Sequence, residues 1–391
     1  MFLLAELKEV AVAVLTAATV AIVIARFKGP AELFVKPPDD EHYYDFIIIG
    51  GGTAGSVLAS RLSERSDYQV LLLEAGTSGV AVDFSLIPAA YGRIMRSKHD
   101  WGLHTVPQHN CNNRELFWTR AKLLGGCSST NAMMFHYGAP TDYDEWSKVT
   151  EAPEGKEWEF EHFQKSFRKF ETFYPHPDFP VDQSKRGADG PIKIMTYIAP
   201  TFTRCSAEAA YLTPTVLARP NLTVATNAHA TRVLFDGKRA VGVEFARNNQ
   251  SPRYQARAHK EVILCAGAIH TPQILMNSGV GPADELKSHT IPLVQDLPGV
   301  GDHLMDHQSV NVRFRTIPGE SMNYLNDNTA TSFDSKLKRL KAISQYLLFK
   351  SGPLTSNLAE AACFFRSDDP TLFPDLPPLH EDTSSALGRQ T

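Results

Sequence analysis

Residues 44–55 read YDFIIIGGGTAG and are followed by SVLASRLSERS and then by VLLLE, which ends at Glu74. The apolar, β-branched run at 44–49 predicts a strand buried on both faces, and the spacing of apolar residues predicts a helix over 56–66. A second apolar run, 70–73, predicts another strand that ends at the acid. Strand, GxGxxG, helix, strand and acid in this order indicate a dinucleotide-binding unit, in which Glu74 accepts hydrogen bonds from the adenosine ribose.

Each part of the glycine turn has a predicted task. Gly50 allows the tight turn, Gly52 lets the backbone approach a pyrophosphate, and Gly55 lets the helix lie close on the strand. The helix N-terminus, at Thr53 and Ala54, presents free N–H groups and a positive dipole end to the phosphates. The motif alone does not separate NAD from FAD. The alternative interpretation is a glycine turn in an α/β unit that binds no nucleotide.

Composition excludes several classes of protein. Of the 391 residues, 43% are hydrophobic and 21% charged, which is ordinary globular usage and argues against disorder or a coiled coil. The length predicts two or three domains. The net charge of −4 argues against a nucleic-acid partner bound by bulk electrostatics. The five cysteines include no CxxC pair, so we expect neither a metal site nor a dense disulfide framework.

The N-terminus, residues 1–28, contains an uncharged run from Val10 to Ala25. The run is near the lower length limit for a membrane span and long for a signal-peptide core. Three interpretations stay open: a single membrane anchor, a cleaved signal, or a buried helix. Arg26 and Lys28 follow the run and would hold the body on the cytoplasmic side. We expect a membrane-associated protein, or a secreted one if the segment is cleaved.

Residues 29–43 are rich in proline and acid and predict a linker, so that the folded body begins near Tyr44. Two sequons, at Asn221 and Asn249, would fit a lumenal body but do not decide the side.

Two further motifs follow the first. Residues 123–133, LLGGCSSTNAM, contain Gly125 and Gly126, which permit close backbone contact, and Asn131, a compact hydrogen-bonding group with an alternative role as a helix cap. Residues 261–282, EVILCAGAIHTPQILMNSGVGP, predict a buried strand and then a helix with Thr271 near its cap and Pro272 in its first turn.

At these residues the chain resembles the glucose–methanol–choline (GMC) oxidoreductases, a family of flavoenzymes. The matching pieces are YDFIIIGGGTAGSVLASRL, VLLLEAG, LLGGCSSTNAMM, DYDEW, GAIHTPQILMNSGVGP and LPGVGDHLMDH, in the same order and spacing. The resemblance covers nearly everything from Tyr44 to about Arg366.

The resemblance implies an α/β fold: a doubly wound FAD-binding domain with a second α+β substrate domain built on an antiparallel sheet. The expected FAD-binding domain comprises 44–150 and 221–307. The expected substrate-binding domain, incomplete here, comprises 151–220 and 308–376. The strands expected at 221–226, 231–235, 241–246 and 261–265 match the family's β-meander. In the second domain, residue spacing predicts a helix from Asp334 or Ser335 to Lys350, then a strand at 354–365.

The resemblance also implies the chemistry. Family members oxidise CH–OH groups of alcohols or sugars, pass a hydride to flavin N5, and reduce an electron acceptor such as oxygen or a quinone or dye. By similarity, the glycine turn and Glu74 hold the pyrophosphate and the adenosine ribose. Gly125, Gly126 and Asn131 would lie along the flavin half, and the backbone of Ala230 would contact the adenine.

The departures from the family concern catalysis. Members are longer and carry a catalytic His, paired with a His or an Asn, near the C-terminus. Here the match ends at 373–376, and the polar residues 377–391 are expected to be a disordered tail, so the chain is expected to be truncated at the C-terminus. No catalytic residue is assigned, because His270, His303 and His307 all lie in FAD-domain motifs.

Three functions follow as hypotheses. The first is an FAD-dependent alcohol or sugar oxidoreductase. The second is an inactive fragment or isoform without the catalytic pair, which binds FAD weakly or not at all and at most associates with a longer paralogue. The third is a light-driven fatty-acid decarboxylase, because Cys265 resembles a stretch of that subgroup. Substrate, oxidase or dehydrogenase character, membrane side and oligomeric state are not predicted.

Overall fold

The computed structural model describes residues 43–150, 153–175, 181–194, 200–248, 250–307, 321–326 and 331–358, and positions 309, 312, 317, 371 and 374. The run from Val10 to Ala25 and the tail at 377–391 lie outside these residues, so both remain predictions. Within the described residues, no helix combines the length and apolar character that a membrane span requires.

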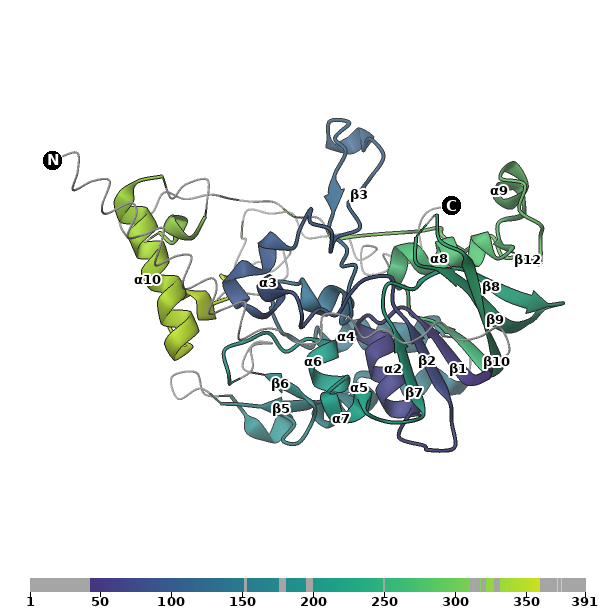
Figure 1. Ribbon diagram of the computed structural model, residues 1–391, viewed down its shortest axis with the longest axis horizontal. Coiled ribbons are helices and arrows are strands. Elements are labelled where there is room, and N and C mark those ends of the chain that lie inside the picture. The colour runs from purple at the N-terminus through teal and green to yellow at the C-terminus, as the bar shows by residue number, and fades with distance from the viewer. Residues whose placement is uncertain are drawn as a thin grey trace.

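One mixed sheet organises the described residues (Figure 1). Six described strands lie in the order β7-β2-β1-β10-β9-β8, with β7, β2, β1 and the end of β10 parallel and β9 and β8 antiparallel. The strands are β1 (Tyr43–Ile49), β2 (Val70–Leu73), β7 (Leu222–Ala225), β8 (His229–Asp236), β9 (Arg239–Ala246) and β10 (Arg253–Leu264). The strands predicted at 44–49 and 70–73 are confirmed as β1 and β2, whereas the helix predicted over 56–66 is α2 (Thr53–Leu62), which begins directly after the glycine turn.

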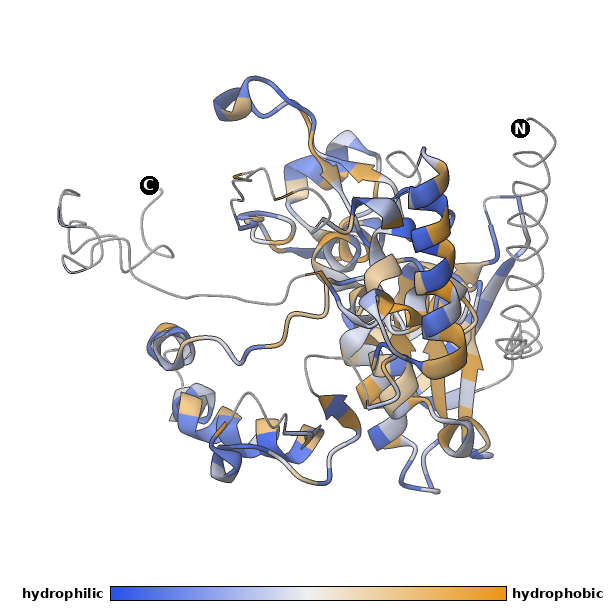
Figure 2. Ribbon diagram, turned by 90° about the vertical axis from the view of Figure 1, so that its left-hand side faces the viewer, coloured by the Kyte–Doolittle hydropathy of each residue, from blue (hydrophilic) through white to orange (hydrophobic). Residues whose placement is uncertain are grey.

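Alternate residues of the central strands serve two different cores. Ile47 and Leu71 point to one face, where they pack with the meander and with Ile274 of α8 (Gly267–Asn277). Ile48 and Leu72 point to the other, where Ala59 of α2 (Thr53–Leu62) covers them. Burial on both faces explains why β1 and β2 are continuous apolar runs. Figure 2 shows the helices with hydrophobic residues on one side and hydrophilic residues on the other.

Strand β10 joins the two parts of the sheet. Its first half pairs with β9 from Arg253 to Arg257, and its second half pairs with β1 from Arg257 to Leu264. The predicted meander is therefore corrected in two places. The strand expected at 221–226 is β7, a parallel neighbour of β2, and the last meander strand begins at Arg253 instead of 261. The first half of β10 is rich in polar residues, so the hydrophobic pattern predicted only its apolar second half.

The helix after β10 also differs from expectation. It begins at Gly267, with Ala266 as its N-cap, so Pro272 lies inside the helix instead of in its first turn. Gly279, in the left-handed region with φ of +87°, follows the end of the helix. The N-cap was predicted near Thr271 because a threonine followed by a proline is a common sequence signal for the start of a helix.

The described residues of the regions assigned to the second domain contain helices and one short strand pair. The described pair, β5 (Glu171–Phe173) with β6 (Ile192–Ile194), is parallel, so the antiparallel sheet and the domain boundaries stay predictions. Helix α10 spans Phe333–Phe349, with Ser332 as its cap, close to the expected bounds. The expected strand at 354–365 begins in a 3-10 turn, Pro353–Thr355, and mostly lies outside the described residues.

The remaining helices and strands are short. They are α3 (Asp83–Leu86), β3 (Leu103–His104), β4 (Phe117–Trp118), α4 (Pro140–Val149), α5 (Phe160–Phe170), α6 (Ala207–Tyr211), α7 (Pro214–Leu217), β11 (Val280–Gly281), α9 (Ala283–Ser288) and β12 (Gln295–Asp296). Strands β3 and β4 form an arm that projects from the body (Figure 1).

One of the two sequons is part of the core. Asn221 is 6% exposed, and its amide donates hydrogen bonds to the carbonyl groups of Ser63, Arg65 and Tyr68. The folded chain therefore cannot carry a glycan at Asn221. Asn249 lies outside the described residues.

Candidate functional site

The first glycine turn needs its glycines for three different reasons. Gly50 has a φ of +97°, and a Cβ there would lie 2.5 Å from the carbonyl O of Cys265. A Cβ at Gly55 would lie 2.0 Å from the carbonyl O of Gly50, so helix α2 touches the strand end. A Cβ at Gly52 would meet no described atom closer than 3.8 Å, the Cα of Gly126. Only Gly52 is therefore free of steric conflict with the protein itself.

Glu74 is anchored to the same turn. Its two carboxylate oxygens accept hydrogen bonds from the backbone N–H groups of Gly51 and Gly76, both at 2.8 Å. Burial raises the pKa of Glu74, while these hydrogen bonds oppose the shift. Each oxygen keeps an acceptor position, because a carboxylate offers about four lone-pair sites.

The second glycine turn lies against the first. Gly125, with φ of +78°, donates its N–H to the carbonyl O of Gly51 at 2.8 Å. Gly126, with φ of +54°, approaches so closely that a Cβ there would lie 2.7 Å from the Cα of Gly52. Asn131 lies at the far end of this turn and is exposed, and its Oδ1 accepts a hydrogen bond from Arg204 at 2.7 Å.

Both turns border one cavity of about 860 Å³ between β1, α2, the start of β8 and α8. This volume lies in the range of small-molecule and cofactor sites. Its lining includes seven of the predicted site residues: Gly50, Gly52, Thr53, Ala54, Glu74, Gly126 and Ala230. The structure therefore brings these residues together from four separate parts of the chain. Gly55, Gly125 and Asn131 do not line the cavity but position the two turns.

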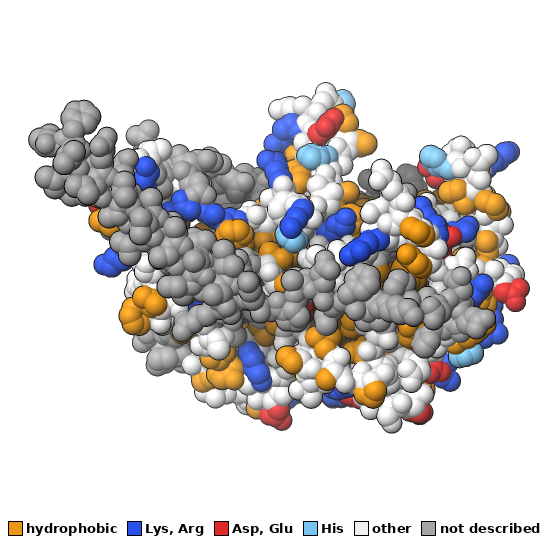
Figure 3. Space-filling view, in the orientation of Figure 1, with side chains coloured by type: hydrophobic (Ala, Val, Ile, Leu, Met, Phe, Trp, Pro, Cys, Tyr) orange, Lys and Arg blue, Asp and Glu red, His pale blue; other side chains and the backbone are white. Residues whose placement is uncertain are grey.

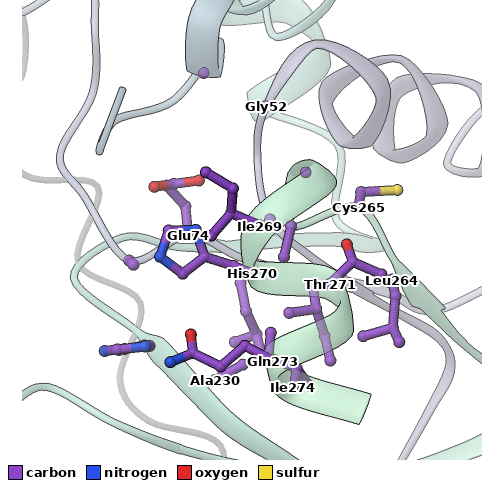
Figure 4. Close-up of a pocket in the computed structure, with 18 of the residues that line it drawn as sticks. Gly52, Glu74, Ala230, Leu264, Cys265, Ile269, His270, Thr271, Gln273 and Ile274 are labelled. Carbon is purple, nitrogen blue, oxygen red and sulfur yellow. The ribbon is translucent and has the colours of Figure 1, made fainter. Parts of the chain in front are cut away.

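A group of rings closes one side of the cavity. The ring of Trp101 lies 4.2 Å from that of His270 and 5.4 Å from that of His229, and Lys122 Nζ lies 4.7 Å from the Trp101 ring. In Figure 4 the Glu74 carboxylate and the His270 imidazole lie on the same side of α8. Burial, followed by nearby positive groups, lowers the pKa of both histidines from 6.5, so both are neutral at pH 7.

Two of these rings could not be predicted from a sequence motif. Trp101 and His229 stand in no motif, and no local pattern marks them as pocket residues. His270 stands inside the quoted GAIHTP stretch, where its ring contact with Trp101 places it in the wall of the cavity. His303 and His307 are exposed and do not line the cavity.

Basic residues surround the base of the β3–β4 arm, as Figure 3 shows on this face. Arg120 packs over Trp118 at 5.6 Å and lines the cavity. Arg232 also lines the cavity but is paired with Glu244 at 2.9 Å. Arg120 forms no ion pair with another described residue, and a cation in the lining favours an anionic ligand such as a diphosphate.

Two cysteines line the cavity. Cys127 is exposed within the second turn. Cys265 is half-buried, and Figure 4 shows its Sγ pointing away from His270. Burial raises the pKa of the Cys265 thiol, so it is protonated at neutral pH.

The residues present fit FAD, the cofactor that the motifs imply. Gly52 leaves space for a phosphate at the N-terminus of α2, and Glu74 keeps acceptor positions for ribose hydroxyls. The backbone of Ala230 borders the same cavity, beyond Glu74. Adenosine, pyrophosphate and a second nucleotide half can therefore be accommodated in one extended cavity.

Comparisons with known proteins agree with this geometry. The family model described as GMC oxidoreductase matches residues 44–196 and 174–309. Dehydrogenase str4 of Strobilurus tenacellus is 40% identical over 386 residues, covering 86% of this chain and 61% of that protein. Oxygen-dependent choline dehydrogenase 1 of Chromohalobacter salexigens is 35% identical over 377 residues, covering 85% and 64%.

Solved structures show the same fold. A formate oxidase of Aspergillus oryzae superposes with a TM-score of 0.69 at 26% identity, covering 82% of this chain and 61% of that one. An FAD-dependent oxidoreductase of Chaetomium thermophilum superposes with a TM-score of 0.67 at 29% identity, covering 80% and 60%. The chain spans less than two thirds of the length of each of these four proteins. With motifs, fold and family model in agreement, the chain belongs to the GMC oxidoreductases, a family of FAD-dependent enzymes.

Proposed function

We propose that the cavity holds FAD and that the protein oxidises a CH–OH group of a small alcohol or sugar. The observation that carries the proposal is the paired glycine turn. Gly52 has open space on the cavity side and is enclosed by Gly126 and Cys265 on the others. A turn that needs glycine without an internal steric reason is explained by a ligand that approaches the backbone.

The residues of this chain bind and orient the cofactor. The N–H groups at the start of α2 face the pyrophosphate, and Glu74 receives the adenosine ribose. Trp101 and His270, whose rings are in contact, form the wall of the cavity beside Glu74. When bound, FAD supplies the acceptor for the hydride of the substrate. The relatives named as oxygen-dependent choline dehydrogenases support an alcohol as donor and oxygen as acceptor.

Purification of the full chain with its visible absorption spectrum tests the cofactor. A flavin spectrum at near-equal stoichiometry is expected, and the variant Gly52→Glu should be colourless, because the carboxylate enters the pyrophosphate position. Undiminished flavin in that variant would disprove the assignment. Turnover is then tested with a panel of alcohols and sugars, using oxygen or a dye as acceptor.

A second candidate is FAD binding without turnover. The two histidines in the described lining contact the ring of Trp101. Lys122 acts electrostatically on both of them and on Glu74, so both histidines lie on the Glu74 side of the cavity. Neither is placed to act as a base at the flavin half. Bound flavin with no activity on any donor would favour this candidate. Light-dependent release of an alkane from a fatty acid would instead favour the decarboxylase suggested by Cys265.

A further inference from the structure

The segment Arg204–Glu208 ties together two loops of the cofactor cavity. Arg204 is 2% exposed, and its guanidinium donates to the carbonyl groups of Ser85, Ser128 and Asn131 at 2.8, 3.0 and 2.8 Å. It also donates to the Asn131 side chain. Glu208 accepts hydrogen bonds from the loop after β2. One short segment therefore fixes both the loop after β2 and the second glycine turn.

The charge of Arg204 has no carboxylate partner among the described residues. All its acceptors are neutral, in contrast to Arg186, which forms a two-point ion pair with the buried Glu171 at 2.8 Å. Burial lowers the pKa of Arg204 to about 10, which shows that the cation is disfavoured in this place. A buried cation bound only by neutral acceptors calls for a functional explanation. A carboxylate partner, or an apolar residue in place of the arginine, would remove the desolvation cost of the buried charge.

The opposite side of the same turn faces the cavity. Gly126 and Cys127 line it, while Ser128 and Asn131 bind Arg204. In a strand–turn–helix site, the acid after the second strand takes the adenosine ribose and the helix N-terminus takes the pyrophosphate. The second half of the dinucleotide therefore continues past the pyrophosphate, along Gly126 and Cys127.

We propose that Arg204 is a positioning residue that holds the Gly125–Asn131 turn as the wall for the flavin half of FAD. The inference rests on the proposed FAD site and deepens it. The planar fork of arginine reaches three carbonyl groups and an amide oxygen at once, which the ammonium of lysine cannot reproduce. Without the guanidinium, the Gly125–Asn131 turn is no longer held in position beside the flavin half. The turn at α2, which binds the ADP half, stays in place.

Titration of the purified apo-protein with FAD and with ADP tests this division. In Arg204→Lys, the affinity for FAD should fall by about tenfold or more, while the affinity for ADP stays within about threefold of wild type. Bound flavin in the variant should also show a shifted visible absorption envelope. The matched control is Arg219→Lys, because Arg219 likewise binds neutral acceptors, Ser60 and Ser63, at the far end of α2. The control should leave both affinities unchanged.

A measurement on the wild type guards against a variant that does not fold. Amide hydrogen exchange should slow across residues 125–131 more on adding FAD than on adding ADP. Equal protection by the two ligands, or a parallel loss of both affinities in Arg204→Lys, would overturn the inference and leave Arg204 a purely structural residue. Failure of the wild type to bind either ligand would instead refute the proposed FAD site, and the inference with it.

Discussion

Replacement of Gly52 by alanine should separate cofactor binding from folding. The φ of −75° at Gly52 suits any L-residue, and its Cβ would meet described atoms only at 3.8 Å and beyond. The free energy of unfolding should therefore stay within about 0.5 kcal/mol of wild type, or rise by up to about 1 kcal/mol because alanine restricts the unfolded chain.

The same methyl group projects toward the pyrophosphate position. Loss of one hydrogen bond from a backbone N–H to a charged phosphate costs about 1.5–3 kcal/mol. At about 1.4 kcal/mol per factor of ten, the dissociation constant for FAD should rise by roughly 10- to 150-fold. Calorimetric titration of the apo-protein with FAD gives the affinity, and scanning fluorimetry gives the melting temperature.

Two other alanine variants make the result interpretable. In Gly92→Ala the new Cβ meets no described atom within 4 Å, and Gly92 lies outside the cavity lining, so the affinity for FAD should not change and the free energy of unfolding should shift by no more than in Gly52→Ala. In Gly55→Ala the Cβ would lie 2.0 Å from the Gly50 carbonyl, so the fold itself should be lost or strongly destabilised. An unchanged affinity for FAD in Gly52→Ala would refute the reasoning.

Three further predictions concern buried polar groups. Burial raises the pKa of Glu208 above its ordinary 4.5, so the stability that its protonated form contributes is lost as the pH rises from 4.5 through the raised pKa of the folded state. In urea unfolding, the free energy of Glu208→Gln should therefore increase relative to that of wild type as the pH rises above 4.5, and the opposite trend would contradict the shift. Glu171→Ala leaves Arg186 without its buried partner and should cost about 3–5 kcal/mol, against almost nothing for Glu64→Ala, whose ion pair with Arg61 is exposed. Tyr346→Phe removes the hydrogen bond to the Phe202 carbonyl and should cost about 1 kcal/mol in urea unfolding, with no effect on FAD affinity.

The site could be predicted from the sequence where its residues act through neighbours in the chain. Gly50 requires a left-handed backbone, and Gly55 meets a carbonyl only five residues away, so both requirements are written in a short motif. Glu74 follows from the second strand of the same unit. These local constraints act before the tertiary fold forms, which is why spacing alone locates them.

The resemblance carried the prediction further, to the second turn and to Ala230, but it did not separate their roles. Gly126 and Ala230 line the cavity, whereas Gly125 and Asn131 hold the turn from outside it. A shift of a few ångströms in the backbone decides whether a residue contacts the ligand or supports a neighbour that contacts it. A sequence motif contains no information on such a shift.

The βαβ unit and its dinucleotide ligand could be predicted from the chain alone, because strand burial and glycine conformation are local properties, and the family followed from the resemblance of several motifs. The distant groups that meet at the unit could be identified only in the folded structure: Trp101 and His229 at the wall, and the buried cation of Arg204 behind the second turn. It also divided β10 between β9 and β1. These contacts join residues far apart in the chain, and their side chains leave no periodic pattern, so they arise only when the sheet and its loops pack together.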